Sequence, residues 1–433
     1  MKPRKLAFDL LQKLEKNRQF SNIALDRALL SYDDMSAADK GLAAALLYGV
    51  TERRITLDYQ ISRRTERQLK DIDLPALTAI RMGLYQLIYM DRIPPHAAIN
   101  ESVELCPKKS SGFVNAILRS YTRNPSLLLP EKNGDIAEYL SVKHSVGLPL
   151  VRKFISVFGE TRADSILASF NKPAKTTVSV NTLKISRDDL SKKIEGSTPT
   201  EFSKNGLHVK GSVRELFGFD SGLFFVQDEA SQICVEALGA KAGERVMDIC
   251  SCPGSKSFGA AVSMNNQGEI FSFDLHEKKL PLIVSGAERL GINIIKTAPC
   301  DGRVFLPEFE ETADRVLCDV PCSGFGVLSK KPELRYKDPK ESEALPSIQL
   351  AILENACRYV KKGGTLVYST CTLFPEENEK NVERFLARHK EFRLSPFSVG
   401  AAEAKEGYLT LLPDTHPTDG FFVARLYRSE ENI

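Results

Sequence analysis

From Gln227 onward, segments typical of strands and of helices alternate along the chain, and this alternation limits the fold more than any other feature. Short apolar runs separated by helical patterns predict five strands. The predicted strands are Arg245–Ile249, Glu269–Phe273, Ile294–Thr297, Arg315–Cys318 and Thr365–Tyr368. Such alternation is typical of an α/β, doubly wound, mostly parallel sheet. We expect Phe421–Leu426 to add an antiparallel strand at the edge of this sheet.

The first half of the chain has a different character, and we predict three domains in all. Residues 1–124 show only helical spacing, for example at Leu77, Ile80, Leu84 and Leu87, and Ser36 with Asp39 resembles a capping box. Residues 125–226 are predicted to hold linker helices and a small α+β domain, in which 176–180 alternates as a strand does. Residues 227–433 form the α/β domain.

Charge and cysteine content narrow the class of protein. Residues 1–124 contain 20 Lys and Arg against 14 Asp and Glu, which hints at contact with nucleic acid. The basic residues of this region that we single out are Arg53, Arg54, Arg63, Arg64, Arg67 and Lys70. A solvated helix face would explain such a run equally well. Nine cysteines without a secretory signal predict reduced thiols and a cytoplasmic location, and we expect no membrane span.

A Pro-Gly turn follows the first predicted strand and leads into a helix. The segment runs from Val246 through Cys250, Ser251, Cys252, Pro253, Gly254, Ser255 and Lys256. In a doubly wound sheet, ligands bind at the carboxyl ends of strands, where glycine permits close approach and a helix start offers free N–H groups. An ordinary strand-turn-helix has the same pattern, so the segment alone leaves both readings open.

Acidic residues follow the next three strands, at Asp274, Asp301 and Asp319. One such residue is usually a turn former or a helix cap. Three at the same sheet edge favour a cofactor site, and Asp274 has the spacing of an acid that binds ribose hydroxyls.

Two cysteines stand just beyond strand ends, in Asp319-Val-Pro-Cys322-Ser-Gly and in Ser369-Thr-Cys371-Thr-Leu-Phe-Pro-Glu-Glu-Asn378. Most free cysteines are small buried residues, which is our interpretation of Cys106, Cys234 and Cys357. The pairs Cys250/Cys252 and Cys318/Cys322 lack zinc-site spacing, so we predict no metal.

Together these motifs resemble those of the RNA (cytosine-5)-methyltransferase family. The matches are Asp248 to Ser257, Asp319 to Gly324 and Ser369 to Asn378, with Gln227-Asp228 and Asp419-Gly-Phe-Phe422 as further points. Ser251-Cys252 replaces the family's Ala-Ala pair, and Ser255 replaces its second glycine. Residues 93–103 and 112–119 resemble a NusB-type helical domain. This layout, with a small RNA-recognition-like middle domain and a Rossmann-like rear domain, is that of RsmB-type enzymes, which modify 16S rRNA.

The resemblance implies an S-adenosyl-L-methionine cofactor and a role for each site residue. Cys371 would attack cytosine C6, Cys322 would assist release, and Asp319 would bind the base beside the cofactor. The backbone of Cys250 to Lys256 would hold the methionine part, Asp274 the ribose and Asp301 the adenine amino group. Lys256 would pair with Asp319 or with an RNA phosphate. The expected partner is ribosomal RNA with a single-stranded or flipped-out cytosine, bound by a monomer.

Three alternatives stay open at this point. Chemistry alone does not rank the two thiols, since the Pro-Cys cysteine is the attacker in DNA cytosine methyltransferases. The same reaction on tRNA or DNA is a second reading. A NusB-like RNA-binding protein with an inactive rear domain is the third, although two intact thiols and Asp319 argue against it.

Overall fold

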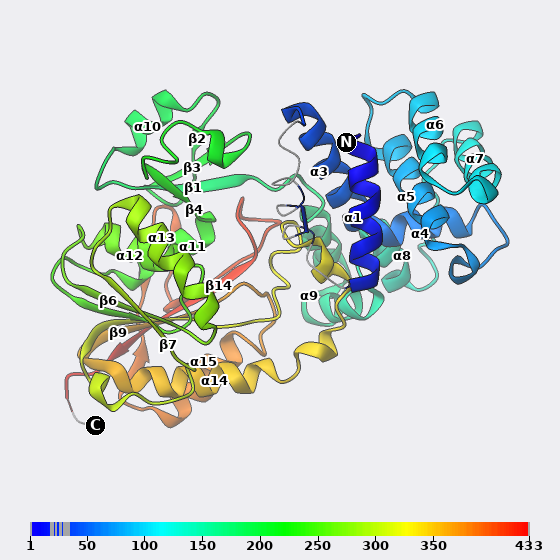
Figure 1. Ribbon diagram of the computed structural model, residues 1–433. Helices are drawn as coiled ribbons and strands as arrows, with labels where there is room; N and C mark the ends of the chain where they lie inside the picture. The colour runs from blue at the N-terminus through cyan, green and yellow to red at the C-terminus, as the bar shows by residue number, and fades with distance from the viewer. Residues whose placement is uncertain (1, 18–20, 22–23, 26–27, 29–34, 432–433) are drawn as a thin grey trace. The chain divides into compact units, whose positions relative to one another are not determined.

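The computed structural model describes residues 2–17, 21, 24–25, 28 and 35–431. The chain folds into two compact units. The first unit holds residues 1–171 together with 328–339, and the second holds residues 172–327 and 340–433. Our boundaries at 124 and 226 stay a prediction. Figure 1 shows the elements of each unit.

The first unit is built from helices, as the apolar spacing predicted. Its helices are α1 (Pro3–Asn17), α3 (Ala37–Glu52), α4 (Arg54–Ser62), η1 (Leu69–Asp71), α5 (Leu74–Tyr89), α6 (Pro95–Leu105), α7 (Lys108–Arg123), α8 (Ile136–His144), α9 (Leu148–Ser169) and η5 (Pro332–Tyr336). The predicted cap is confirmed, because the N–H of Asp39 donates to Ser36 Oγ at 3.1 Å. Leu77, Ile80 and Leu84 are buried in the core that α5 shares with its neighbours.

A small α+β layer opens the second unit, as predicted. Its antiparallel sheet has the strand order β2-β3-β1-β4. The strands are β1 (Thr176–Val180), β2 (Thr198–Pro199), β3 (Gly206–Val209) and β4 (Phe224–Val226), accompanied by α10 (Arg187–Lys193) and η2 (Val213–Glu215). Alternate residues of β1, Val178 and Val180, pack against Leu190 of α10.

The main sheet of the second unit has the order β10-β14-β9-β8-β5-β6-β7, with β13 also paired to β14. Its strands are β5 (Arg245–Asp248), β6 (Glu269–Asp274), β7 (Ile295–Pro299), β8 (Ala313–Asp319), β9 (Val360–Thr370), β10 (Phe392–Leu394), β13 (Tyr408–Leu411) and β14 (Phe421–Arg428). All five predicted parallel strands are present, and β5 to β9 pair in parallel. The late strand β14 is antiparallel, but our edge position was wrong, because β14 lies between β9 and β10.

Helices cover both faces of this sheet (Figure 1). Val246 faces the core shared with α11 and α12, and its neighbour Met247 faces the core on the side of α14 and α15. The helices are α11 (Glu229–Leu238), α12 (Ser255–Ser263), η3 (Glu277–Lys279), α13 (Leu280–Leu290), η4 (Pro307–Phe309), η6 (Pro339–Ser342), α14 (Leu345–Ala356), η7 (Cys357–Tyr359) and α15 (Glu379–Arg388), with the hairpin β11 (Phe397–Val399) and β12 (Ala402–Ala404). The chain turns from one side of β5 to the other between β7 and β8, which is the crevice-forming arrangement of doubly wound folds.

Two further properties concern the described residues alone. None of the helices among them is long and apolar enough to cross a membrane. Within the same part of the chain, no group of three or more His, Cys, Asp or Glu side chains is arranged to hold a metal ion.

Candidate active site

The parallel strands deliver the predicted site residues to one edge of the main sheet. Asp248 ends β5, Asp274 ends β6, and Asp319 ends β8. Thr370 ends β9 and places Cys371 immediately beyond it. Because β6, β5, β8 and β9 are neighbours, these four strand ends form a continuous row.

The loop after β5 is fixed by its backbone. Ser251 N and Ser251 Oγ both donate to the carbonyl oxygen of Phe273, each at 2.8 Å. Gly254 has φ +108°, which L side chains rarely adopt, and a Cβ there would lie 2.7 Å from Cζ of Phe258. Helix α12 begins directly afterwards at Ser255, the position where the family's motif has its second glycine. Serine therefore serves there as an ordinary first helical residue.

Asp274 lies beside this loop. Its Oδ2 accepts from the N–H of Cys252 at 3.2 Å, and its Oδ1 accepts from the N–H of His276 at 2.9 Å. Burial and the nearby Asp274 raise the pKa of the Cys252 thiol to about 12, so this cysteine stays protonated. The carboxylate is thus held in place by backbone groups and has lone pairs to spare for hydroxyl groups.

Asp301 is engaged with its own neighbour. Both carboxylate oxygens accept from the guanidinium of Arg303, the shortest contact being 2.6 Å. Hydrogen bonds from the Arg303 side chain and backbone lower the pKa of Asp301 to about 2. Binding of an adenine amino group by Asp301 would share these oxygens with Arg303, or displace it.

Lys256 reaches from α12 to Asp319 at the end of β8. Its Nζ lies 2.6 Å from Asp319 Oδ2, and Ser369 Oγ donates to the other carboxylate oxygen at 2.8 Å. Burial alone would lower the pKa of Lys256, but the charge of Asp319 outweighs it and raises that pKa. Of the two pairings predicted for Lys256, the structure has the one with Asp319.

The two predicted thiols lie against each other. Cys322 Sγ and Cys371 Sγ are 3.1 Å apart, and the N–H of Cys371 donates to Cys322 Sγ at 3.3 Å. The hydrogen bond with Cys371 and burial raise the pKa of Cys322 well above its ordinary value. Two thiols in contact at this distance titrate as a coupled pair.

Asp248 lies in the same row of strand ends, but we assigned it no role from the sequence, although it begins the first matched motif. It is buried, and its Oδ2 accepts from Ser257 Oγ at 2.6 Å. Its Oδ1 is buried and accepts no hydrogen bond from the part of the chain that the structure describes. Burial raises the pKa of Asp248 to about 7, and a buried carboxyl group of this kind can bind a polar ligand group.

The remaining cysteines that we interpreted as buried residues are buried. Cys106, Cys234 and Cys357 have 9%, 0% and 3% of their surface exposed. Burial raises the pKa of Cys234 to about 12, and of Cys357 likewise, so neither is a ready nucleophile.

The basic residues of the first unit fall into two groups. Arg53, Arg54 and Arg64 are half-buried and bound internally. Arg53 lies 3.3 Å from Glu52, Arg54 stacks 4.0 Å over the ring of Tyr336, and Arg64 donates to Gln60 and Ser126. Arg63, Arg67 and Lys70 are exposed, although Arg67 also lies over the ring of Phe113, 4.7 Å from its centroid. An exposed cation can contact a phosphate.

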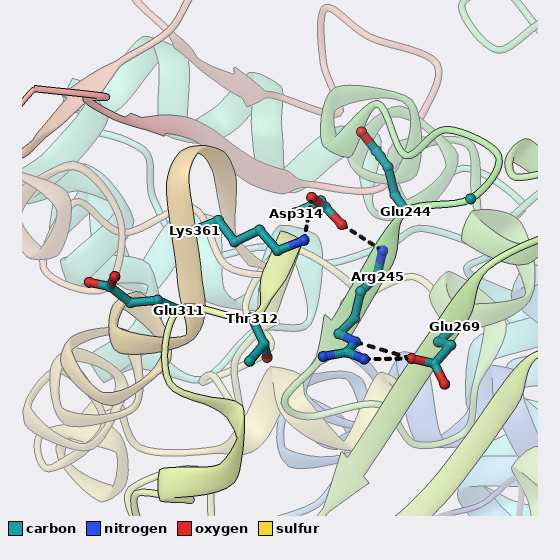
Figure 2. A pocket seen from close by; sticks show the side chains of 8 residues that line it. Glu244, Arg245, Glu269, Glu311, Thr312, Asp314 and Lys361 are labelled. Carbon is teal, nitrogen blue, oxygen red and sulfur yellow. Dashed lines mark hydrogen bonds and ion pairs between the residues drawn. The ribbon is translucent and has the colours of Figure 1, made fainter.

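A polar hollow of about 370 Å³ lies at the opposite, amino-terminal ends of the strands and contains none of the predicted site residues. Figure 2 shows Lys361 turned toward Asp314 and Arg245 toward Glu269. Lys361 pairs with Asp314 at 2.8 Å and Arg245 with Glu269 at 2.9 Å, so these groups neutralise each other.

The residues at the carboxyl edge fit a nucleoside cofactor. Helix α12 begins there at Ser255, Asp274 suits ribose hydroxyls, and Asp248 Oδ1 is a buried acceptor without a hydrogen-bond partner among the described residues. With two adjacent thiols, this fold and site define a nucleoside-dependent transferase of the Rossmann-like methyltransferase class.

Comparison with known proteins narrows the class. The family described as 16S rRNA methyltransferase RsmB/F matches residues 235–427, and the NusB family matches residues 1–123.

Several whole proteins resemble the chain over nearly their full length. The "Probable ribosomal RNA small subunit methyltransferase B" of Bacillus subtilis (strain 168) is 35% identical, over 98% of both chains. The "Ribosomal RNA small subunit methyltransferase B" of Klebsiella pneumoniae is 30% identical, over 96% of both. The crystal structure of a protein named PH0851 has a TM-score of 0.80 and 27% identity, covering 98% of this chain and 99% of its own. The chain belongs to the RsmB/F family of S-adenosyl-L-methionine-dependent rRNA methyltransferases.

Proposed function

We propose that this enzyme methylates C5 of one cytosine in 16S rRNA, through a covalent bond between Cys371 Sγ and cytosine C6. The observation that carries this proposal is the contact of Cys322 and Cys371, 3.1 Å apart at the sheet edge that also holds Asp319. The names of the relatives, which are small-subunit rRNA methyltransferases, support the substrate. We expect a monomer that acts in the cytoplasm on a single-stranded or flipped-out base.

The cofactor would be held by the loop Cys250 to Lys256, by Asp274 at the ribose and by Asp301 at the adenine, and when bound it supplies the methyl group. Asp248, with its buried unpaired oxygen, is a further candidate at the methionine end. The contact of Asp274 with the N–H of Cys252 supports this set, because it ties the acid to the loop.

The thiols work on the base in order. The Cys371 thiolate adds to C6, the C6–S bond forms, and the electron pair of the C5=C6 bond makes C5 nucleophilic. After methylation a base removes the C5 proton, C5=C6 re-forms, and the C6–S bond breaks to return the thiolate. We assign assistance of this last step to Cys322. The 3.1 Å contact of the two sulfur atoms supports a shared role on one base, because both thiols can then reach the same C6 atom.

We assign to Asp319 the role of accepting a hydrogen bond from the N4 amino group of the base, or from N3 once N3 is protonated, which would stabilise the electron-rich ring. Its pairing with Lys256 at 2.6 Å keeps the carboxylate in one orientation. A positive charge there also offsets the carboxylate, which would otherwise oppose formation of a thiolate nearby.

Alanine substitution of each thiol tests the assignment. Cys371→Ala removes the attacker, so we expect neither methylated RNA nor a covalent RNA complex. Cys322→Ala leaves attack and methyl transfer in place but stalls release, so a protein–RNA adduct that survives a denaturing gel should accumulate with S-adenosyl-L-methionine. The double variant should form no adduct, because the attacker acts first. An adduct from Cys371→Ala and none from Cys322→Ala would reverse the two roles.

A further inference from the structure

Beneath the two thiols lies a pair of adjacent buried polar residues to which we have given no role, Glu377 and Asn378. They are 3% and 0% exposed. Glu377 Oε2 accepts from the backbone N–H of Ser323 at 2.9 Å and from Gln349 Nε2 at 2.8 Å. Since Ser323 follows Cys322, Glu377 holds the loop that carries the first thiol.

Asn378 holds the loop of the other thiol from both sides. Its Nδ2 donates to the carbonyl oxygen of Thr372 at 3.0 Å, and its Oδ1 accepts from Thr370 Oγ1 at 2.5 Å. Cys371 is the residue between these two threonines. One buried amide therefore binds the side chain of the residue before Cys371 and the backbone of the residue after it.

The two loops also bind each other directly. Ser323 Oγ and Thr372 Oγ1 are 2.8 Å apart, and the N–H of Gly326 donates to the carbonyl oxygen of Cys371 at 2.9 Å. Glu377 itself is anchored, because Tyr368 Oη donates to its carbonyl oxygen and Gln349 Nε2 donates also to Pro321. The result is a closed polar network around the two sulfur atoms, in which loss of one member leaves others unsatisfied.

We propose that Glu377 and Asn378 are positioning residues that set the separation of Cys322 and Cys371. This rests on the proposed function, in which the two thiols act in sequence on one base. Because the two residues are neighbours in the chain, a single short segment holds both cysteine loops in register. Catalytic groups displaced by about 1 Å lose on the order of 100-fold in rate, so a device that fixes this distance belongs to the catalytic apparatus.

Three substitutions in the full-length enzyme test the proposal. Asn378→Asp keeps the acceptor for Thr370 but replaces the donor to Thr372 with an oxygen. Glu377→Met removes both acceptor contacts at similar side-chain length. Glu377→Gln retains an acceptor for Ser323 and serves as the conservative rescue. Glu376→Met is the matched control, since Glu376 is the preceding acidic residue, is half-buried and pairs with Lys380 at 3.7 Å.

Phenylarsine oxide reports the sulfur–sulfur separation without turnover. Its arsenic forms bonds to two thiols and releases water, so capture requires both sulfurs within bridging distance. We expect wild type and Glu376→Met to be captured across Cys322 and Cys371, as shown by peptide mass spectrometry. Capture should be about tenfold slower or more in Asn378→Asp and Glu377→Met, and largely restored in Glu377→Gln.

Steady-state kinetics give the second readout. We expect kcat to fall about 10- to 100-fold in Asn378→Asp and Glu377→Met, with the KM for RNA and the Kd for S-adenosyl-L-methionine unchanged. Wild-type capture rates in both variants would overturn the positioning role. If Asn378→Asp does not fold by circular dichroism, the contrast between Glu377→Met and Glu377→Gln decides. Methylation that survives Cys371→Ala would instead refute the proposed function and leave the capture result standing.

Discussion

At the scale of single residues, Asp248 combines burial with an unpaired oxygen, and this has a consequence for stability. Its folded-state pKa is raised by burial from 3.8 to about 7, while the unfolded chain ionises near 4. Between these values only the folded state keeps the proton. The free energy of unfolding of the cofactor-free protein should therefore fall as pH rises from about 4 to about 7, by on the order of 4 kcal/mol.

Asp248→Asn removes this titration and keeps the volume of the side chain. We expect the variant to gain stability over wild type as pH rises, so that its advantage is larger at pH 8 than at pH 5. Urea denaturation at pH 5 and at pH 8 measures the stability of both proteins. Far-ultraviolet circular dichroism follows the unfolding, which suits a chain without tryptophan. If the free energy of unfolding changed with pH in the same way in wild type and in Asp248→Asn, Asp248 would be ionised at all these pH values in the folded state.

At the scale of elements, the sequence predicted what depends on local pattern and missed what depends on long-range contact. The strands β5 and β6 were found because a short apolar run between turn residues indicates a buried strand. The edge position of β14 was wrong, since partners in a sheet are chosen across the chain rather than within a strand. The sequence likewise did not predict the contacts of Glu377 and Asn378, because their partners lie on other loops.

The segment 328–339 is the clearest case of a contact that no local pattern encodes. The chain leaves the second unit at Val327, packs within the first unit, and returns at Lys340. Its sequence is polar and resembles an exposed loop, yet Arg335 is 0% exposed. The Arg335 guanidinium donates to the carbonyl oxygens of His144 at 3.0 Å and Phe170 at 2.7 Å. A charge at this depth is tolerated only with such partners.

Replacement of Arg335 by Met should therefore destabilise the first unit. Methionine fills much of the same space but leaves the carbonyl oxygens of His144 and Phe170 without their donor. At about 1–3 kcal/mol for each unsatisfied buried group, we expect a loss of about 3 kcal/mol or more. Arg152→Met is the control, since Arg152 is 62% exposed and its pair with Asp135 is screened by solvent. Equal unfolding midpoints of the two variants would contradict the buried role of Arg335.

At the scale of the whole molecule, the question is how an enzyme of modest net charge, +3, selects RNA. The exposed residues Arg63, Arg67 and Lys70 are the candidates for phosphate contact in the first unit, whereas Arg54 and its internal neighbours are already engaged. Deletion of residues 1–124 would test this poorly. It would remove Glu52 and Arg54, which contact segment 328–339, and so would disturb more than RNA binding.

Substitution at the surface avoids this problem. We expect Arg63→Gln, Arg67→Gln and Lys70→Gln together to weaken binding of a 16S rRNA fragment and to lower the salt slope of log K by about 2–3, since each phosphate contact releases about 0.7–0.9 counterion. Binding of S-adenosyl-L-methionine should not change, because all its predicted contacts follow Gln227. The matched control replaces Lys296, Lys362 and Lys390, exposed residues of the second unit, with the same loss of charge. A slope lowered only in the first variant places the phosphate contacts at Arg63, Arg67 and Lys70. If the two triple variants have the same salt slope, net charge rather than these three residues governs RNA binding.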